Sequence, residues 1–265
     1  MAKRREKVKY YITLIIAIII IGFILFLSVK VVKQKKESVH IVLVPTPSII
    51  PTKTVSQTIV YKNITYAYAY FEVEGLADLK LIPNFKEKKG SGELKREYTC
   101  KAGINGSYYD KEGDPLGGFT SGGNTLKKPI SSRLMDGYVS IEGTKADIGF
   151  SPLPKASIIL QAGPLLLINR EVTKLKIASD ESARRSIAAI TVNKKLLFLT
   201  VYNPESTYLG PYLSQLPAII QLISDTLPSP IISAINLDGG NASVFFNEEI
   251  TLSELSPIGS LFCLR

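Results

Sequence analysis

The sequence predicts an α+β fold of mixed, largely antiparallel sheets with few helices, preceded by one N-terminal transmembrane helix. Three observations support this prediction. Short apolar or alternating runs, divided by Gly, Pro and Asn, fill residues 57–265. That region has only one segment with convincing helical periodicity, and its strands and helices do not alternate regularly. A single uncharged apolar stretch lies near the N-terminus.

Residues 10–29 form the predicted membrane anchor. This stretch, YYITLIIAIIIIGFILFLSV, carries no charge, and a helix of its length spans about 30 Å, the thickness of the hydrocarbon core of a bilayer. A cleaved signal peptide would have a shorter apolar region and an A-x-A-like site, which the sequence lacks. We expect residues 1–9 to be a basic cytoplasmic head of a single-pass cell-membrane protein whose N-terminus is inside and whose domain is extracytoplasmic.

The charge of the chain belongs mainly to the flanks of this anchor. The formal net charge is +9, but residues 1–36 hold nine of the 32 Lys and Arg residues and one of the 23 acidic residues. The rest of the chain therefore has 23 basic and 22 acidic residues. Such a balance gives the folded part no bulk attraction for polyanions, so no nucleic-acid partner is expected.

Residues 30–56 are expected to form a stalk, and residues 57–265 the domain that it holds off the membrane. Three prolines, Pro45, Pro47 and Pro51, stiffen the backbone of the stalk and remove hydrogen-bond donors.

The predicted elements of the domain are mostly strands. One or two strands are expected within residues 58–74, where β-branched and aromatic residues alternate with others. Further strands are expected at 98–105, 137–142, 157–161, 164–169, 186–192, 195–202, 231–237 and 243–247. The one predicted helix covers 211–227, where apolar residues recur at helical spacing, Pro211 suits a first turn and Pro217 is expected to bend or delay the helix.

The residue inventory of the domain excludes several kinds of chemistry. The only histidine, His40, lies in the stalk, so the domain has no imidazole base for a Ser-His-Asp or Cys-His arrangement. Two cysteines cannot form an all-cysteine zinc site. Cys100 and Cys263 either pair in an oxidising compartment or remain two buried thiols, and the sequence leaves both alternatives open.

Three segments rich in Gly, Asn, Asp or Arg interrupt the apolar runs. INGSYYDKEGDPLGG (104–118) contains turn signals, and its acidic spacing and missing downstream Glu argue against a calcium loop. ARRSIAAI (183–190) places two arginines before an apolar strand, where one could clamp phosphate or carboxylate. SAINLDGGNASVFF (233–246) delivers Asn236 and Asp238 at the end of a strand, which suits general acid/base work or transition-state stabilisation. Taken alone, Asp-Gly-Gly is more often just a turn.

These segments, taken in order, resemble the phosphodiester glycosidase family. The resemblance covers roughly residues 95–250 and consists of NGSYYD with the following G-x-P-L-G, QAGPLLL at 161–167, Arg-Arg-Ser at 184–186, and NLDGG at 236–240. It implies a glycosidase that hydrolyses a sugar 1-phosphodiester of the N-acetylglucosamine type, or a related bond in a surface glycan. The implied partners are a glycan or sugar-phosphate substrate and, through the anchor, the membrane.

The resemblance also implies the site residues. Asp238 is expected to be the catalytic carboxylate, with Arg185 holding the phosphate and Asn236 and Asn105 orienting sugar hydroxyls or water. Substrate-binding positions are expected at Gly106, Gly163, Ser186, Gly239, Gly240, Ser243, Glu205 and Asp110, of which Glu205 and Asp110 are also candidates for a second carboxylate.

The sequence departs from the family pattern at three places. Asn241 and Ala242 precede Ser243 where the family usually has a third Gly and two Ser, Ala189 replaces a common Gly, and the loop 202–210 lacks the frequent Gly-Arg. A second hypothesis is therefore a non-catalytic surface-glycan binding module with a degenerate active site. A third is a stalked structural protein without a small ligand. No cofactor or metal site is predicted, and a requirement for a divalent metal is left open.

Overall fold

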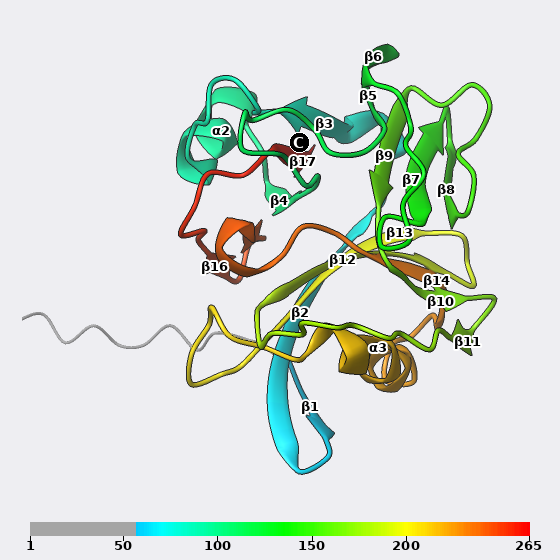
Figure 1. Cartoon of the computed structure of the whole chain (residues 1–265), viewed down its shortest axis with the longest axis vertical. Coiled ribbons are helices and arrows are strands. Elements are labelled where there is room, and N and C mark those ends of the chain that lie inside the picture. Colours follow the sequence, from blue (N-terminus) through cyan, green and yellow to red (C-terminus); the bar gives the residue numbers. More distant parts are fainter. Residues whose placement is uncertain (1–56) are drawn as a thin grey trace, which may run out of the picture. The chain divides into compact units, whose positions relative to one another are not determined.

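A computed structural model describes residues 57–265 of the chain (Figure 1). The predicted cytoplasmic head, the anchor at 10–29 and the stalk at 30–56 all lie outside these residues. Within the described part, no helix is both long and apolar enough to cross a membrane.

The larger of three sheets has seven strands in the order β1-β2-β13-β12-β14-β10-β11, and every pair of neighbours is antiparallel. Their bounds are β1 Gln57–Tyr61, β2 Ile64–Val73, β10 Leu165–Ile168, β11 Glu171–Val172, β12 Arg185–Thr191, β13 Leu196–Tyr202 and β14 Ile231–Asn236. The predicted run at 58–74 thus forms two strands joined as a hairpin. The central strands β12 and β13 are buried along their whole length.

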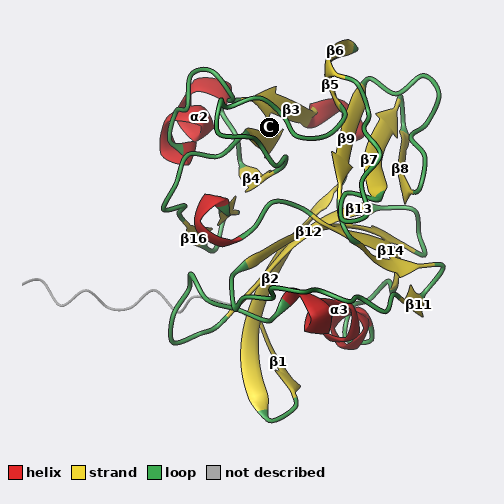
Figure 2. Cartoon of the chain, viewed as in Figure 1, coloured by secondary structure: helices red, strands yellow, loops and turns green. Residues whose placement is uncertain are grey.

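Two five-stranded antiparallel sheets complete the architecture (Figure 2). One has the order β16-β15-β4-β17-β3, with β3 Leu79–Pro83, β4 Ala102–Asn105, β15 Phe245–Phe246, β16 Thr251–Leu252 and β17 Ser260–Leu264. The other has the order β6-β5-β9-β7-β8, with β5 Phe119–Ser121, β6 Asn124–Lys127, β7 Gly137–Glu142, β8 Lys145–Gly149 and β9 Ile158–Ala162. The prediction of largely antiparallel sheets is confirmed for the described residues.

The described part contains two α-helices, α2 Ser91–Tyr98 and α3 Leu216–Ser224, and three 3-10 turns, η1 Leu76–Asp78, η2 Leu213–Gln215 and η3 Gly240–Ala242. The predicted helix at 211–227 is present but shorter, because Pro217 occupies its first turn. Proline suits that position, where its missing N–H and fixed φ cost nothing. The expectation that Pro217 delays the helix is confirmed, whereas the expectation that Pro211 begins it is wrong.

Two layers of apolar side chains cover the two faces of the seven-stranded sheet. Successive residues of a strand point to opposite faces, so Ala188 and Ile190 of β12 join the core shared by all three sheets. Ile187 and Ala189 instead pack with the apolar face of α3. Figure 1 shows α3 against one side of this sheet and the smaller sheets on the other. The central strands β12 and β13 are mostly apolar because both of their faces are covered.

Two predicted strands are corrected by the structure. The segment 98–105 is a strand only from Ala102, because α2 ends at Tyr98 and the chain turns through Thr99, whose φ is 54°. The segment 243–247 contains only the short strand β15, since η3 precedes it. Sequence periodicity did not identify α2 or the strands β3, β5, β6, β8, β11, β16 and β17.

Cys100 and Cys263 form a disulfide, which decides between the two alternatives that the sequence left open. The bridge joins residues 163 positions apart and lies in a small apolar cluster between α2 and β17. It ties the C-terminal strand to the turn before β4.

We expect replacement of both cysteines by Ala to lower the free energy of unfolding by about 2–5 kcal/mol, because the bridge restricts the unfolded chain. Urea denaturation with and without reductant measures this difference. The free energy of unfolding of reduced wild-type protein should match that of the double variant to within about 1 kcal/mol. The remaining difference reflects the side-chain packing that the change to Ala removes. Two titratable thiols in protein purified without reductant would contradict the bridge.

Candidate active site

The site lies at the edge of the seven-stranded sheet where β14 ends beside the first residues of its two neighbours. β14 ends at Asn236, while its antiparallel neighbours β12 and β10 begin at Arg185 and Leu165. Antiparallel neighbours place the end of one strand beside the start of the next. Segments far apart in the sequence are therefore brought to one edge, and Asp238 follows β14 directly into this edge.

Backbone hydrogen bonds hold the loop after β14. The N–H of Asp238 donates to the carbonyl of Gly106 at 3.0 Å, and the N–H of Gly240 donates to the carbonyl of Arg184 at 3.0 Å. Gly240 has a φ of 64°, in the left-handed region that glycine adopts without steric cost. The turn signal in Asp-Gly-Gly is thus used for a turn, and that turn presents the Asp238 side chain.

Asn105 lies behind this loop and ties it to two other segments. Its Nδ2 donates to the carbonyl of Asp238 at 2.7 Å. Its Oδ1 accepts hydrogen bonds from the Ser186 hydroxyl at 2.7 Å and from the Val244 N–H at 2.9 Å. The side chain is 1% exposed. Asn105 therefore holds the position of Asp238 from beneath and does not line the pocket described below.

The two adjacent arginines have different surroundings. Arg184 is 0% exposed, and its guanidinium donates to backbone carbonyls and a hydroxyl. Nε donates to the Ser243 hydroxyl at 2.6 Å, and the two Nη atoms donate to the carbonyls of Ser243, Thr207 and Ser253. Burial lowers the pKa of Arg184 to about 10, so it stays charged at neutral pH. Arg184 joins three loops and faces the interior.

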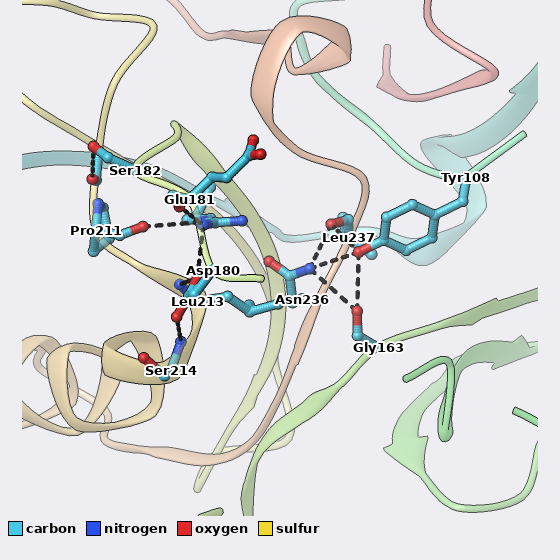
Figure 3. A network of polar contacts seen from close by, with 12 residues as sticks. Tyr108, Gly163, Asp180, Glu181, Ser182, Pro211, Leu213, Ser214, Asn236 and Leu237 are labelled. Carbon is cyan, nitrogen blue, oxygen red and sulfur yellow. Dashed lines mark hydrogen bonds and ion pairs between the residues drawn. The ribbon is translucent and has the colours of Figure 1, made fainter. Parts of the chain in front are cut away.

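Arg185 lies at the pocket, and much of its guanidinium is already engaged. Nε donates to the Pro211 carbonyl at 3.0 Å, and Nη2 donates to the Glu181 carbonyl. Nη2 also lies 3.7 Å from a carboxylate oxygen of Asp180 (Figure 3). The remaining nitrogen, Nη1, lies on the side of Gly239. Arg185 can offer a ligand one nitrogen rather than a full two-pronged clamp.

Asn236 and Tyr108 form a second polar group at the pocket. Asn236 Nδ2 lies 2.6 Å from the Tyr108 hydroxyl, 3.1 Å from the Gly163 carbonyl and 2.8 Å from the Leu237 carbonyl. The Tyr108 hydroxyl lies within 2.9 Å of the same two carbonyls (Figure 3). A Cβ at Gly163 would lie 2.2 Å from the Leu134 carbonyl, so only glycine fits this close approach.

Arg185, Asn236, Tyr108 and Asp238 line a pocket of about 470 Å³, called the larger pocket below. Its polar or charged wall contains Tyr108, Asp180, Glu181, Arg185, Asn236 and Asp238, and its apolar wall contains Leu116, Leu134, Met135, Pro164, Ile177 and Leu213. A second pocket of about 420 Å³ adjoins it and is lined by Tyr109, Asp110, Lys111, Asn241 and Ser256 among others. Four residues line both pockets: Tyr108, Leu116, Asp238 and Gly239. Asp238 therefore stands where the two pockets meet.

The carboxyl group of Asp238 has an unusual acidity. Burial raises its pKa to about 7, and a hydrogen bond from the Gly239 N–H, at 2.9 Å, opposes this rise. Near neutral pH the group is therefore divided between the acid and the carboxylate. Perturbed carboxyls in clefts are typical of catalytic sites, since they can exchange a proton at working pH.

The predicted site residues fall into three groups. Asp238, Arg185, Asn236, Gly163, Gly239 and Gly240 line the larger pocket, and Asp110 lines the smaller one. Asn105, Gly106, Ser186 and Ser243 are packed behind the NLDGG loop and support it. Glu205 is exposed in the loop after β13 and lines neither pocket.

Three titratable residues of the larger pocket, Tyr108, Asp180 and Glu181, were not predicted as site residues from the sequence. Tyr108 stands in the NGSYYD segment but carries no signal of its own beyond the motif. Asp180 and Glu181 stand in an acidic run shortly before Arg185, and that proximity of opposite charges could have indicated them. Burial alone would raise the pKa of Asp180, but hydrogen bonds from Ser214 and Leu213 and the nearby Arg185 outweigh it and lower the pKa.

The described residues contain no group of three or more His, Cys, Asp or Glu side chains placed to hold a metal ion.

Comparison with known proteins identifies the class. A sequence model of the phosphodiester glycosidase family matches residues 98–259, and the chain belongs to that family. No curated protein matches the sequence significantly.

Solved structures share the fold at low sequence identity. The catalytic domain of zebrafish N-acetylglucosamine-1-phosphodiester alpha-N-acetylglucosaminidase, described as auto-inhibited by its pro-peptide, matches with a TM-score of 0.62 at 16% identity, over 79% of this chain and 81% of that chain. A hypothetical protein from Synechocystis matches with a TM-score of 0.61 at 12% identity, over 78% of this chain and 61% of its own. A putative exported protein from Burkholderia pseudomallei matches with a TM-score of 0.50 at 10% identity, over 76% of this chain and 73% of its own.

We expect Arg184→Ala to lower the free energy of unfolding by about 3–5 kcal/mol, because it leaves several buried acceptors without donors. Arg96→Ala, an exposed change on α2, is the matched control and should change it by less than about 0.5 kcal/mol. Urea denaturation followed by circular dichroism measures both. A loss below about 1 kcal/mol for Arg184→Ala would show that these hydrogen bonds are dispensable.

Asp238→Asn should stabilise the fold at alkaline pH. The folded-state pKa of about 7 lies above the ordinary value of 3.8, so Asp238 ionises more readily in the unfolded chain than in the folded one. The wild-type protein therefore loses stability as the pH rises between these two values, and the Asn variant does not. The full shift corresponds to about 4 kcal/mol, and access to solvent reduces this to about 1–2 kcal/mol at pH ~8.

The difference between Asp238→Asn and wild type should vanish below about pH 4, where Asp238 is protonated in both the folded and the unfolded state. Denaturation midpoints measured across this range test the prediction. A difference that does not change with pH would refute the raised pKa.

Proposed function

We propose that this chain is a membrane-anchored extracytoplasmic glycosidase that hydrolyses a sugar 1-phosphodiester, or a related bond in a surface glycan. The observation that carries the proposal is the position of Asp238, a carboxyl with a pKa of about 7 at the junction of two pockets in a phosphodiester glycosidase family member. The zebrafish protein with a similar fold is named for an N-acetylglucosamine 1-phosphodiester, which motivates the substrate class. The proposed anchor is the apolar stretch at 10–29.

In the proposed reaction, Asp238 lies beside the bond that joins the sugar to the phosphate. Water adds its oxygen to the anomeric carbon, the bond from that carbon to the phosphate oxygen breaks, and one water proton passes to the solvent or the released phosphate. Phosphate is a good leaving group, so its protonation matters less than in an ordinary glycoside. The larger task is to stabilise positive charge on the sugar ring, for which the ionised form of Asp238 is suited.

Two cations lie on either side of Asp238 and are the candidates to contact the phosphate. Arg185 directs Nη1 toward the side of Gly239, while Lys111 lines the smaller pocket on the other side of Asp238. The positive charge of Arg185 is largely compensated by Asp180 and by carbonyl oxygens. Lys111 is exposed, and Asp110 lines the same pocket beside it. Either cation can approach one oxygen of a phosphodiester monoanion.

A non-catalytic surface-glycan binding module is the second candidate. The observation in its favour is the replacement of the family's usual Gly-Ser-Ser by Asn241, Ala242 and Ser243. In this chain Asn241 and Ala242 lie in the turn η3, and Arg184 binds Ser243. Such a module would bind the glycan without forming a product.

Incubation of the full-length chain with an N-acetylglucosamine 1-phosphodiester should release free sugar, measured with and without divalent metal. Asp238→Asn should reduce the rate by about 10²–10⁴-fold. Glu93→Gln, an exposed change on α2, controls for the loss of one carboxylate and should leave the rate unchanged. Saturable binding without release, by a folded wild-type protein and across several sugar phosphodiesters, would favour the binding module.

If the ionised form of Asp238 is the active one, the turnover rate should rise with pH through about 7 and then level off. A pH profile of kcat/KM measures this limb, because kcat/KM reports the pKa values of the free enzyme. A rate that falls through the same range would assign the protonated form, and therefore a general-acid role, to Asp238.

A further inference from the structure

Asn236 holds an acceptor that no protein group uses. Its Oδ1 is buried and receives no hydrogen bond from the described residues, although the whole side chain is only 2% exposed. A buried acceptor left without a donor costs about 1–3 kcal/mol. Asn236 also lines the larger pocket beside Asp238. A native fold that retains such an acceptor at a pocket wall is suited to receive a donor from a ligand.

The orientation of the Asn236 amide is determined by its surroundings. Nδ2 faces the carbonyls of Gly163 and Leu237, which can only accept hydrogen bonds, so the nitrogen and oxygen cannot be exchanged. Figure 3 shows Tyr108 and Gly163 on the nitrogen side of the amide and the oxygen on the opposite side. The pocket therefore meets an acceptor at this position and not a donor.

Tyr108 maintains that orientation. Its hydroxyl lies between the two carbonyls and accepts from Asn236 Nδ2 at 2.6 Å. Burial, and then the nearby charge of Asp238, raise the pKa of Tyr108 far above its ordinary range. The hydroxyl thus keeps its proton at any working pH, donates it to a carbonyl, and leaves a lone pair for Asn236.

The charges of the larger pocket limit what can bind beside this acceptor. Asp180, Glu181 and Asp238 line it against the single cation Arg185, which is itself paired with Asp180. This balance disfavours an anionic group deep in the pocket. The apolar wall and the acceptors suit an uncharged sugar ring, whose hydroxyl or amide N–H groups are hydrogen-bond donors.

We propose that Asn236 is a specificity-determining residue, whose Oδ1 accepts a hydrogen bond from one hydroxyl or amide N–H of the sugar bound beside Asp238. Tyr108 is its positioning residue. This inference rests on the proposed function and adds to it that the larger pocket takes the sugar, so that the phosphate side of the substrate extends toward the smaller pocket. A site built around a buried polar group rejects analogues that lack the matching group, because the protein group is then left unpaired.

The test measures binding in the Asp238→Asn background of the full-length chain, where turnover does not interfere. The probes are N-acetylglucosamine 1-(methyl phosphate) and four analogues, of which three lack the 3-, 4- or 6-hydroxyl and one has hydrogen in place of the 2-acetamido group. We expect one analogue to bind about 10- to 100-fold more weakly than the parent. Adding Asn236→Leu should reduce that ratio to within about threefold, because the acceptor is gone.

Tyr108→Phe is the second variant, chosen because it removes one oxygen and leaves Asn236 its two carbonyl partners. It should weaken discrimination against the same analogue about 3- to 10-fold. A merely structural role would weaken the parent and all analogues alike and leave the ratios unchanged. Tyr98→Phe, a change on α2 away from the pocket, is the matched control and should leave both affinities and ratios unchanged.

Equal affinity for the parent and all four analogues, retained discrimination in the Asn236→Leu variant, or no binding of any probe would overturn the inference. Release of free sugar by the wild-type chain tests the proposed function independently of these binding measurements. Selective binding that depends on Asn236, with no release of sugar by wild type, would sink the hydrolase and leave the acceptor role standing.

Discussion

The antiparallel pairing of β14 with β12 is the constraint on which the site depends. Its register sets Ile187 opposite Asn236, so the residues before β12 and the residues after β14 leave the sheet at the same edge. Asn105 then fastens this edge to β4 by bonds to Ser186, Val244 and Asp238. A shift of one residue would turn every side chain of β14 to the opposite face, removing Asn236 from the pocket and Ile235 from the core.

This constraint separates two arginines that look equivalent in sequence. Arg184 turns inward, where the loops around it provide acceptors for its donors, and Arg185 turns toward the pocket beside Asp180. A buried guanidinium is tolerated only when its donors are satisfied, and here backbone carbonyls and a hydroxyl satisfy them. The positive charge available to a ligand is consequently smaller than the pair of arginines suggests.

The site carries free-energy costs that the rest of the fold offsets. Asp238 is desolvated enough to raise its pKa to about 7, and Asn236 keeps an acceptor that no protein group uses. Both costs occur in one pocket, whereas the surrounding strands are apolar and covered on both faces. Among the described residues, Thr200 Oγ1 and Gln215 Oε1 are also buried without a partner, but of these three acceptors Asn236 alone lines the pocket that holds Asp238. An unpaired acceptor and a desolvated carboxyl that coincide in one pocket are typical of a functional site.

The sequence by itself determined the class of fold, the long strands, the family and the segments that meet at the site, because apolar periodicity and glycine-rich turns are local properties. It could not determine that Asn105 supports the site from behind, that Arg184 is structural, that Tyr108 and Asp180 line the pocket, or that Cys100 pairs with Cys263. Elements such as β16 and β17 were also decided by tertiary structure, since pairing partners rather than local propensity stabilise them. The direction of a side chain and the partners of its polar atoms depend on strand register and on contacts between distant segments, which no local pattern encodes.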